Sequence, residues 1–378
     1  YMRILELTNY TAGSCGVGKR VIRESQMLSK KGHIVRIFSS NLVKGKSQIC
    51  PKSEKIGEVI INRFPAKKLG GEGFLLWNFE EEAKKFNPDI IITHSYRHIH
   101  TLKTLKLANK LNIPCMLVTH APFKREKTRT FIQNIIVQLY DLLIGRNTIT
   151  KFNKILMIAP WETEHLLKLG VSKDKIIYSP NGVDARFFKR KITNNKSGLV
   201  IYAGRIAPIK NLEVLINSMS SVDETISLLI YGPAEEDYLI RLKDLIDKNS
   251  LQKRVSIINK EYDLKSQLEL LDKAEIFVLP SKSEGMPQSL IEAMARGKIV
   301  IGSDILSINS IIKDGINGLT FKEGDSENLA KKINMAINLA SSKRRNICEA
   351  AISSARAFKW PLIIKNLNKL ILEMGKSK

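Results

Sequence analysis

Short runs of apolar, mostly β-branched residues alternate with stretches of helical periodicity along the first half of the chain. Runs that are apolar throughout are typical of strands buried on both faces of a parallel sheet. The predicted strands of this half are Arg3–Thr8, Ile34–Phe38, Val59–Phe64, Asp89–Thr93, Cys115–Thr119 and Ile155–Ile158. Residues Val17–Lys31 carry apolar side chains at roughly helical spacing and end before Gly32, a helix stop. This order of strand, helix and strand predicts a βαβ unit.

The same alternation begins again at Gly198. The predicted strands of this second series are Leu199–Ala203, Ile226–Tyr231, Val255–Ile258, Ile276–Leu279, Ile299–Ser303 and Leu319–Phe321. Helices are predicted at about 210–220, 235–249, 263–273, 287–296 and 325–340. The lysine-rich stretch Lys189–Ser197 lacks apolar periodicity and is predicted as a linker. We therefore predict an α/β protein with two doubly wound domains, whose ligands bind at the carboxyl ends of the strands.

The chain is strongly basic, with 61 Lys and Arg against 37 Asp and Glu and a net charge of +24. A charge of this size attracts polyanions such as nucleotide phosphates, anionic lipids and nucleic acids. Aromatic residues make up only 7% of the chain and no nucleic-acid module is recognisable, so we expect no nucleic acid as partner. A lysine-rich surface that serves only solubility is the simpler explanation of much of this charge.

The cysteines and the hydropathy place the chain among soluble proteins. The four cysteines form no C-x-x-C pair, which argues against a metal or disulfide framework and fits a reducing cytoplasm. The sequence contains no run of about 18 apolar residues and no secretory signal pattern. We therefore expect a cytoplasmic protein.

The loop after strand Ile276–Leu279 leads into a helix that is predicted to begin at Pro287. Proline suits the first helical position, and the free amides of a first helical turn form an anion site. Glu284 before this helix and Glu292 in its second turn add carboxylates, which can accept hydrogen bonds from sugar hydroxyls. The alternative interpretation makes Glu284 a capping acid and Glu292 a solvated surface residue.

Two cations follow the strand Leu199–Ala203. Arg205 can bind a diphosphate through its planar fork, and Lys210 can do so as a point charge. Because the chain is rich in lysine, this pair alone does not separate a diphosphate site from ordinary surface charge.

A glycine-rich stretch, Gly13–Arg20, joins the first strand to the first helix, and its glycines would let the backbone approach a phosphate. Gly13, Gly18 and Lys19 also satisfy the first seven positions of the P-loop pattern. The eighth position needs Ser or Thr to hold magnesium, but here it is Arg20. A P-loop NTPase or kinase is therefore an alternative that lacks its metal ligand.

Taken together, these stretches resemble the sequence motifs of glycosyltransferase family 4. The members of this family are retaining enzymes of GT-B architecture, with two Rossmann-like domains facing across a cleft. The resemblance spans nearly the whole chain, because its pieces occur in the family's order: Cys15–Lys19, Gly32–Val35, Thr119-His120, Pro180–Asp184, Gly204-Arg205 with Lys210, Glu284 through Glu292, Asp314–Leu319 and Trp360. It implies an acceptor-side domain over 1–188, a nucleotide-sugar-binding domain over 198–355, and a C-terminal helix over 356–378 that crosses back toward the N-terminal domain.

The resemblance further implies the reaction. The chain would transfer a hexose, with retention and without a metal or other cofactor, from a UDP- or GDP-sugar to a glycan or lipid-linked acceptor. A nucleotide-sugar-binding protein without catalysis is a second alternative, and a phosphorylase is a third. A phosphorylase would be expected to carry a lysine-bound pyridoxal group on a much longer chain.

Roles for single residues follow from the same resemblance. Arg205 and Lys210 match the pair that binds the donor diphosphate and stabilises the leaving charge. Glu284 matches the first acid of the E-x7-E motif, which holds donor-sugar hydroxyls, and Glu292 matches the second, which holds the ribose. The other donor-binding residues are expected to be Gly16, Gly285, Met286, Gln288 and Ser289.

His120 completes the expected catalytic set of Arg205, Lys210, Glu284 and His120, because it matches a family histidine near the reacting sugar. The alternative is a structural histidine at the end of a buried strand. Two positions depart from the family pattern: Cys15 stands where a glycine is frequent, and Ser310 stands where an acid often precedes the Asp314-Gly315 turn.

Residues Phe123–Phe152 are the candidate acceptor side. Four basic residues, Lys124, Arg125, Lys127 and Arg129, precede a helical stripe of apolar residues, Phe131, Ile135, Ile136, Leu139, Leu142 and Leu143. A basic segment before an amphipathic helix suits an anionic membrane surface. This favours peripheral attachment to the inner face of the cell membrane, whereas the alternative is a helix that covers the N-terminal sheet.

Overall fold

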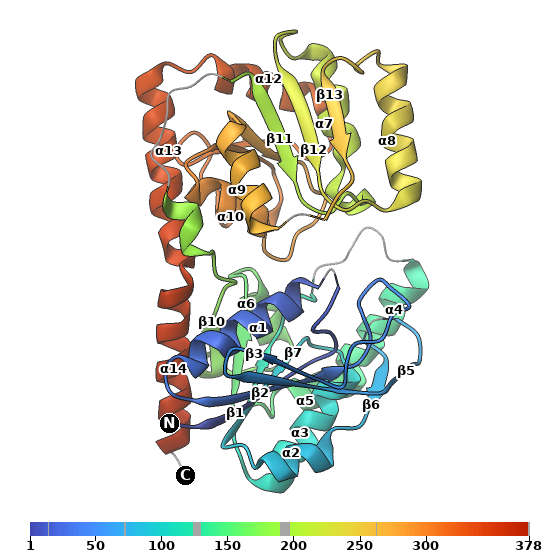
Figure 1. Ribbon diagram of the computed structural model, residues 1–378, viewed down its shortest axis with the longest axis vertical. Helices are drawn as coiled ribbons and strands as arrows, with labels where there is room; N and C mark the ends of the chain where they lie inside the picture. The colour runs from blue at the N-terminus through green and yellow to red at the C-terminus, as the bar shows by residue number, and fades with distance from the viewer. Residues whose placement is uncertain (14, 72, 124–129, 190–196, 262, 377–378) are drawn as a thin grey trace. The chain divides into compact units, whose positions relative to one another are not determined.

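A computed structural model describes residues 1–13, 15–71, 73–123, 130–189, 197–261 and 263–376 (Figure 1). Ser14 of the glycine-rich stretch, the four basic residues before Phe131 and most of the expected linker lie outside these ranges. The chain forms two compact units. Among the described residues, unit 1 contains 1–123, 130–181 and 361–376, and unit 2 contains 182–360.

Unit 1 is built on an eight-stranded sheet of order β10-β9-β8-β7-β1-β2-β4-β3. Its strands are β1 (Arg3–Thr8), β2 (Ile34–Ser40), β3 (Ser53–Ile56), β4 (Val59–Phe64), β7 (Ile90–His94), β8 (Cys115–Val118), β9 (Lys154–Met157) and β10 (Ile176–Tyr178). All pair in parallel except β3, which is antiparallel to β4 at the edge. A separate hairpin joins β5 (Ala66–Lys68) to β6 (Leu75–Trp77).

The helices of unit 1 lie on both faces of this sheet. They are α1 (Gly16–Ser29), α2 (Glu80–Phe86), α3 (Ile99–Leu111), α4 (Phe131–Tyr140), the π-helix η1 (Asp141–Gly145), α5 (Arg146–Ile149), α6 (Glu162–Lys168) and α14 (Trp360–Lys376), with a 3₁₀ turn η2 (Lys173–Lys175). The chain moves from β1 to β2 toward one edge of the sheet and from β7 to β8 toward the other. Because such crossovers are right-handed, α1 and α3 cover opposite faces (Figure 1).

The C-terminal helix α14 belongs to unit 1 from Pro361 onward, as the resemblance implied. Its apolar residues Ile363, Ile364, Leu367 and Ile371 are buried. Nε2 of His33, the residue before β2, lies 2.6 Å from Oδ1 of Asn368. The backbone of Gly375 lies so close to Met2 that an added Cβ would be 2.4 Å from the Met2 sulfur.

Unit 2 is built on a six-stranded parallel sheet of order β13-β12-β11-β14-β15-β16. Its strands are β11 (Leu199–Ala203), β12 (Ser227–Tyr231), β13 (Val255–Ile258), β14 (Ile276–Leu279), β15 (Ile299–Ser303) and β16 (Leu319–Phe321). Its α-helices are α7 (Leu212–Ser218), α8 (Glu236–Lys248), α9 (Leu264–Lys273), α10 (Gln288–Ala295), α11 (Leu306–Asn309), α12 (Ser326–Ile337) and α13 (Ser341–Ala355). Short 3₁₀ turns are η3 (Ala185–Lys189), η4 (Pro208–Lys210), η5 (Met219–Ser221) and η6 (Arg356–Phe358).

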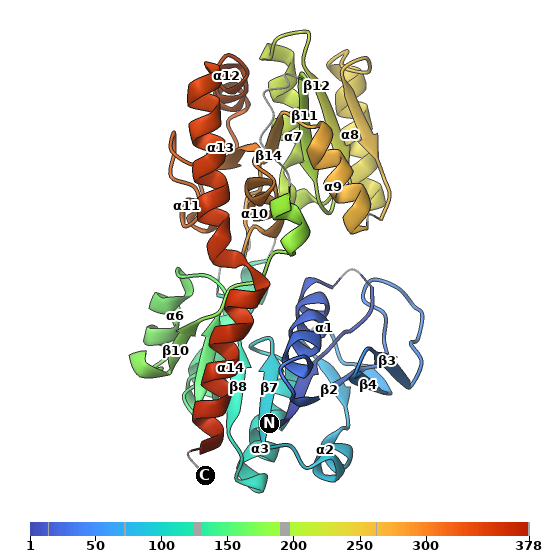
Figure 2. The same cartoon turned by 60° about the vertical axis from the view of Figure 1, so that its left-hand side comes forward.

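Two helical layers enclose this second sheet. Helix α7 packs against α8 and α12, while α10 packs against α13 and against β14 and β15 (Figure 2). Strands β11, β14 and β15 lie between these layers and are almost entirely buried. Each unit is therefore a doubly wound α/β domain, which confirms the predicted fold class.

Every strand predicted from an apolar run is present, but four strands were not predicted, and no range was predicted for several helices, among them α2, α3, α6, α11 and α13. Strands β3, β5 and β6 contain charged or exposed residues, and β10 has only three residues, so none of them shows the apolar run of a buried strand. Helix α13 alternates small and charged residues, which weakens its helical stripe.

Helix α4 does not cover the sheet of unit 1, so that interpretation is wrong for α4, whereas Ile149 and Phe152 at the end of the segment are buried in the core. No residue of α4 is buried. The apolar residues of α4 and η1 are exposed instead, to 79% at Phe131, 64% at Leu142 and 66% at Leu143.

Candidate functional site

The loops after β11 and β14 carry three of the four predicted catalytic residues. The two strands are neighbours in the sheet, so their carboxyl ends lie side by side. The backbone N–H of Lys282, in the second loop, donates to the carbonyl of Ile209 in the first at 3.0 Å. This contact places Lys210 of η4 next to Glu284.

Lys210 and Glu284 form a largely buried ion pair. The distance from Lys210 Nζ to Glu284 Oε1 is 2.5 Å, and the two side chains are 18% and 10% exposed. The hydroxyl of Ser281 donates to the same carboxylate oxygen at 2.6 Å. Glu284 makes no capping bond to α10, so the interpretation of Glu284 as a capping acid is wrong. The structure thus brings together a predicted diphosphate-binding cation and a predicted sugar-binding acid.

Glu292 is held by two amide side chains. Gln288 donates from Nε2 to Glu292 Oε1 at 3.2 Å, and Gln267 of α9 donates to Oε2. Glu292 is therefore half-buried and oriented, rather than the solvated surface residue of the alternative interpretation. Helix α10 begins at Gln288, one position later than we predicted. Pro287 is its N-cap residue rather than its first helical residue.

The other predicted donor-binding residues of unit 2 lie on the same turn. Gly285 and Met286 connect Glu284 to Pro287, and Ser289 is the second residue of α10. Met286 is buried, whereas Gly285 and Ser289 are half-buried. These residues, together with Lys210, Glu284 and Glu292, occupy one edge of the sheet of unit 2.

Arg205 leaves the same edge but points to a more exposed position. Its Nη1 lies 3.0 Å from Glu235 Oε1, and the side chains of Arg205 and Glu235 are 56% and 50% exposed. The Arg205 carbonyl accepts a hydrogen bond from the Tyr202 hydroxyl at 2.6 Å. Behind this loop, Gly232 has a φ of +148°, and an added Cβ would be 1.9 Å from the carbonyl oxygen of Gly204. The backbone that carries Arg205 is therefore fixed from two sides.

Two further residues of the family pattern pack against each other in unit 2. An added Cβ at Gly182 would be 2.1 Å from the indole ring of Trp360, so only glycine fits beneath this ring. The Gly182 carbonyl accepts from Gln288 Nε2 at 2.9 Å. Gly182, packed beneath Trp360, thereby holds the side chain of Gln288, which in turn orients Glu292.

In unit 1, Gly16 is the first residue of α1, at the carboxyl end of β1. An added Cβ at Gly16 would meet no atom within 4 Å, whereas one at Gly18 would be 2.5 Å from the Tyr10 carbonyl. Gly18 is therefore required by packing, and Gly16 leaves open space at the helix start. Cys15, which departs from the family glycine, is the N-cap residue, and its sulfur accepts from the Gly18 N–H at 3.3 Å.

Arg20 has a structural role that counts against a P-loop. Its buried guanidinium donates to Glu24 Oε2 at 3.1 Å, to the Ser179 carbonyl at 2.8 Å and to Asn181 Oδ1 at 3.1 Å. It thus ties α1 to the segment after β10. A magnesium-binding hydroxyl has no place at this position.

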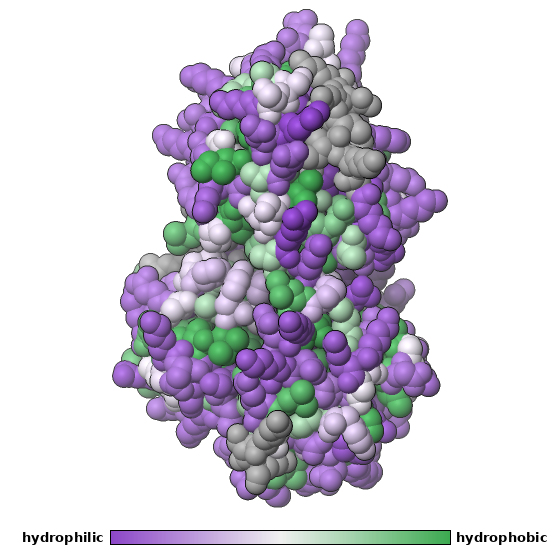
Figure 3. All heavy atoms as spheres, turned by 90° about the vertical axis from the view of Figure 1, so that its left-hand side faces the viewer, coloured by the Kyte–Doolittle hydropathy of each residue, from purple (hydrophilic) through white to green (hydrophobic). Residues whose placement is uncertain are grey.

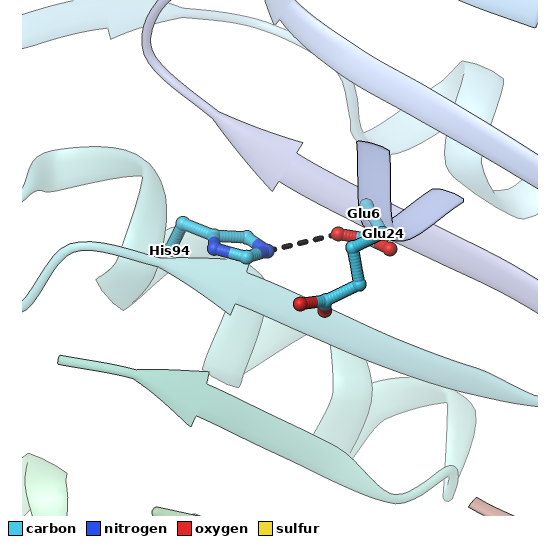
Figure 4. Close-up of side chains that lie close together, drawn as sticks. All are labelled: Glu6, Glu24 and His94. Atoms are coloured by element: carbon cyan, nitrogen blue, oxygen red, sulfur yellow. Dashed lines mark hydrogen bonds and ion pairs between the residues drawn. The ribbon is translucent and has the colours of Figure 1, made fainter. Parts of the chain in front are cut away.

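His120 follows β8 and is linked to two buried residues. Its Nε2 lies 3.0 Å from Nδ1 of His94. On the other side of the His94 ring, Nε2 lies 2.9 Å from Oε2 of Glu6, the contact drawn in Figure 4. Burial lowers the pKa of His120 well below the usual range of a histidine and lowers the pKa of His94 to about 3. Burial raises the pKa of Glu6 to about 8, although the Ser25 hydroxyl and the Arg20 charge lower it.

Among the described residues, Glu6, Glu24 and His94 are the one group of potential ligand atoms that lie within 4.8 Å of one another. Figure 4 shows the three side chains pointing toward one another from β1, α1 and β7. The guanidinium of Arg20 already supplies a positive charge to Glu24, and Glu6 and His94 are at hydrogen-bonding distance. We therefore assign no metal ion to this group.

The sequence analysis did not identify Glu6, His94, Ser281 and Gln267. A signal was present for Glu6, because an acid inside an apolar strand must be hydrogen-bonded or neutral once it is buried. Gly16 and His120 belong to unit 1, and every other predicted site residue belongs to unit 2.

Solved structures of known proteins share the fold of this chain. A sucrose-phosphate synthase from Thermosynechococcus elongatus covers 100% of both chains with a TM-score of 0.82 and 17% identity. HepE of Anabaena, solved in complex with UDP and glucose, covers 99% of this chain and 100% of its own with a TM-score of 0.76 and 16% identity. This likeness shows the fold: two Rossmann-like domains, as in the GT-B architecture.

Sequence comparison identifies the family. The profile of Glycosyltransferase Family 4 matches residues 15–187, and that of Glycosyl transferases group 1 matches residues 184–354. The chain belongs to glycosyltransferase family 4. None of its described helices is long and apolar enough to cross a membrane.

Three relatives illustrate the similarity in sequence, and two of them have named reactions. An uncharacterized glycosyltransferase of Methanocaldococcus jannaschii is 24% identical and covers 84% of this chain and 86% of its own length. The UDP-Gal:alpha-D-GlcNAc-diphosphoundecaprenol alpha-1,3-galactosyltransferase of Escherichia coli is 26% identical over 70% of this chain and 69% of its own. The N,N'-diacetylbacillosaminyl-diphospho-undecaprenol alpha-1,3-N-acetylgalactosaminyltransferase of Campylobacter jejuni is 25% identical over 63% and 59%.

Proposed function

We propose that the chain is a retaining, metal-independent hexosyltransferase that uses a UDP- or GDP-sugar and a lipid-linked glycan acceptor. The observation that carries this proposal is the cluster of Lys210, Glu284 and Ser281 at the carboxyl edge of the sheet of unit 2. HepE was solved with UDP and glucose, which supports the donor class, and the Escherichia coli and Campylobacter relatives are named for diphosphoundecaprenol acceptors.

The cluster suits the charge changes of sugar transfer. Breaking the bond between the anomeric carbon and the diphosphate places negative charge on phosphate and positive charge on the sugar. Lys210 has three N–H donors, and Glu284 takes one of them, so two remain to stabilise the phosphate. Preorganised cations can do this work without a metal ion. Arg205 on the adjoining turn and the amides at the start of α10 would add to this stabilisation.

Glu284 would hold hydroxyls of the donor sugar, and Glu292 would hold the ribose. Both carboxylates are already oriented, by Ser281 and Lys210 in one case and by Gln288 and Gln267 in the other. Retention would follow from attack on the face that the diphosphate leaves, with the leaving phosphate taking the proton of the acceptor hydroxyl. Glu284 and Glu292 therefore act as binding groups, and neither is needed as a base.

The donor is tested by thermal shift and by transfer. We expect UDP or GDP, alone or as its sugar, to raise the melting temperature, because a ligand that binds only the folded state stabilises it. Sugar transfer to a diphosphate-linked lipid acceptor should continue in EDTA, and NMR of the product should show the anomeric configuration of the donor. An inverted product, or activity lost in EDTA and restored by magnesium, would contradict the proposed mechanism.

An exposed apolar surface on α4 and η1 supports a membrane-bound acceptor. Eight large apolar side chains of this segment are exposed: Phe131, Ile132, Ile135, Ile136, Leu139, Leu142, Leu143 and Ile144. A contiguous apolar surface of this kind marks a protein or membrane contact. By contrast, the face of unit 1 that carries α14 is mainly hydrophilic, with small and separate apolar areas (Figure 3).

Polar contacts attach this helical segment to the body of unit 1. The carboxylate of Asp141 accepts from the Tyr96 hydroxyl at 3.1 Å and from the Arg97 guanidinium at 2.9 and 2.5 Å. The segment is thus held in place while its apolar side stays exposed. In the sequence, four basic residues stand within the six positions before Thr130, and each could add about 1 kcal/mol at an anionic surface. We infer that α4 and η1 rest on an anionic membrane.

The membrane contact is tested with the double substitution Leu142→Gln and Leu143→Gln. Burying one leucine contributes about 1.5–3 kcal/mol, so we expect partitioning onto anionic liposomes to fall at least about tenfold. The matched control is Leu306→Gln with Ile240→Gln, two exposed apolar residues of unit 2. Co-sedimentation at low salt measures both variants. Equal binding of the two variants, or no binding of the wild type, would rule out this contact.

A further inference from the structure

A continuous hydrogen-bonded chain runs from the interior of unit 1 to its surface. Glu6 and His94 are fully buried, in β1 and at the end of β7, and His120 is partly exposed after β8. The two links of the chain are 2.9 Å, between Glu6 Oε2 and His94 Nε2, and 3.0 Å, between His94 Nδ1 and His120 Nε2. His120 lies at the carboxyl edge of the sheet, the edge at which doubly wound sheets bind ligands.

The two distances restrict where hydrogens can be. Each link needs one hydrogen, and a neutral imidazole carries one hydrogen on one of its two nitrogens. With the hydrogen of protonated Glu6 on Oε2, the oxygen that faces His94, two arrangements satisfy both links. In the first, Glu6 is protonated and donates to His94 Nε2, His94 donates from Nδ1 to His120 Nε2, and His120 carries its hydrogen on Nδ1. In the second, Glu6 is a carboxylate, His94 donates from Nε2, His120 donates from Nε2, and His120 Nδ1 is an acceptor.

The two arrangements differ by one proton, which enters or leaves at His120 Nδ1. When Nδ1 releases its hydrogen, the hydrogen on His94 Nδ1 moves to His120 Nε2, and the hydrogen on Glu6 moves to His94 Nε2. Both imidazoles are neutral before and after, and the negative charge appears on Glu6. We propose that Glu6, His94 and His120 form a hydrogen relay in which Glu6 stores a proton and His120 exchanges it at the surface of the site.

The surrounding charges favour the protonated arrangement at neutral pH. Glu24 has Arg20 as its ion-pair partner at 3.1 Å, whereas Glu6 shares the same buried space with Glu24. Two carboxylates beside one guanidinium favour one ionised and one neutral acid. Burial raises the pKa of both acids, that of Glu6 to about 8, while the Arg20 charge lowers both, and the pKa values of both histidines are lowered, so neither ring takes the proton.

The remaining titratable neighbours do not join the relay. His100 donates from Nε2 to the His94 carbonyl at 2.9 Å, which fixes the position of that strand end. His98 Nδ1 lies 2.8 Å from the amide nitrogen of Asn9. Glu162 accepts from the Ala121 N–H at 3.1 Å, next to His120, and burial raises the pKa of Glu162 to about 7. Glu162 thus titrates in a similar range without touching either ring.

The relay gives Glu6 and His94 a positioning role, because they set what His120 presents to a ligand. Below the titration of Glu6, His120 Nδ1 is an N–H donor that can hold a sugar oxygen, and above it Nδ1 is an acceptor. This consequence rests on the proposed function, which assigns His120 to the reacting sugar. The transfer rate should therefore fall as the pH rises through about 8.

The direct test is imidazole ¹⁵N NMR of the unliganded wild-type chain, which needs no enzymatic activity. We expect the hydrogen of His120 to move from Nδ1 to Nε2 as the pH rises through about 8, with His94 changing in the same step. The change should be absent in Glu6→Gln, whose side chain cannot ionise. It should persist in Glu162→Gln, the matched control in which a neighbouring buried carboxyl is removed.

A second readout is the free energy of unfolding. The folded chain holds a proton on Glu6 between pH 4.5, the ordinary value for the carboxyl, and about 8, while the unfolded chain has released it. The raised pKa of Glu6 therefore makes stability fall with increasing pH in this window, and Glu6→Gln should remove that part of the slope.

The results separate the relay from the proposed function. A wild-type chain that shows the hydrogen shift but transfers no sugar would leave the relay standing and remove the proposed function. The relay is overturned if His120 keeps one hydrogen position throughout, if it becomes an imidazolium, if Glu6→Gln still shows the shift, or if added Zn²⁺ binds the His94 ring stoichiometrically. Because the wild-type titration decides by itself, an unfolded variant would not leave the question open.

Discussion

Replacing Lys210 with alanine is expected to lower kcat by about a hundred- to thousandfold. Removing one preorganised donor from a site of developing negative charge typically costs about 2.7–4 kcal/mol of barrier. The substitution also leaves Glu284, which is 10% exposed, without its cation, although Ser281 still donates to it. We expect the loss in kcat to exceed the change in KM for the donor, because the charge on the leaving phosphate grows in the transition state.

Steady-state kinetics with the best donor of the thermal-shift screen measure this effect. Lys265→Ala is the control, because Lys265 is a highly exposed lysine on α9, outside the cluster. A Lys210→Ala variant that melts like the wild type and keeps its kcat within a few-fold would show that Lys210 does not stabilise the leaving group.

The second large effect is expected for stability. Gly232→Ala should lower the free energy of unfolding of unit 2 by about 2–6 kcal/mol, which adds about 1–3 kcal/mol of backbone strain to about 1–3 kcal/mol of overpacking. Both causes are present, because Gly232 has a φ of +148° and an added Cβ would be 1.9 Å from the Gly204 carbonyl oxygen. The free energy of unfolding of a typical domain is roughly 5–15 kcal/mol, so such a loss would be a large part of it.

Gly324→Ala separates the two causes. Gly324 has a φ of +82°, but an added Cβ there would meet no atom within 4 Å, so only the backbone strain of about 1–2 kcal/mol applies. Urea denaturation of both variants gives the comparison. Equal losses would mean that the Gly204 loop moves aside without cost.

Much of the fold could be predicted because its strands are buried on both faces. Strands such as β11 and β14 are apolar throughout, and burial of both faces requires such a run. The edge strands β3 and β10 of unit 1 escaped prediction because they contain no fully buried residue. Strand β3, for example, has three exposed residues and pairs only with β4.

The site could be predicted in part. Loops that follow neighbouring parallel strands must meet at one sheet edge, which is why Lys210 and Glu284 lie together. The ion pair between them could not be predicted, because it depends on the Ile209 to Lys282 backbone contact between two loops. The relay at Glu6 and His94 was missed for a similar reason, since 88 residues separate the two partners.

The exposure of α4 also could not be predicted from the sequence. An apolar stripe on a helix is equally suited to covering a sheet and to resting on a membrane. The structure shows that α4 does not cover the sheet, because Asp141 of the adjoining π-helix is bound by Tyr96 and Arg97 while no residue of α4 is buried.

The position of α14 has a consequence for biosynthesis. The described residues of unit 2 all lie between Gly182 and Trp360, whereas unit 1 includes residues from Pro361 onward, among them the buried Ile363, Ile364, Leu367 and Ile371. During synthesis from the N-terminus, the first β-strand must therefore wait for the last helix to leave the ribosome, while unit 2 can fold earlier. A nascent chain that stops before α14 would expose the surface that this helix covers and would be a target for chaperones.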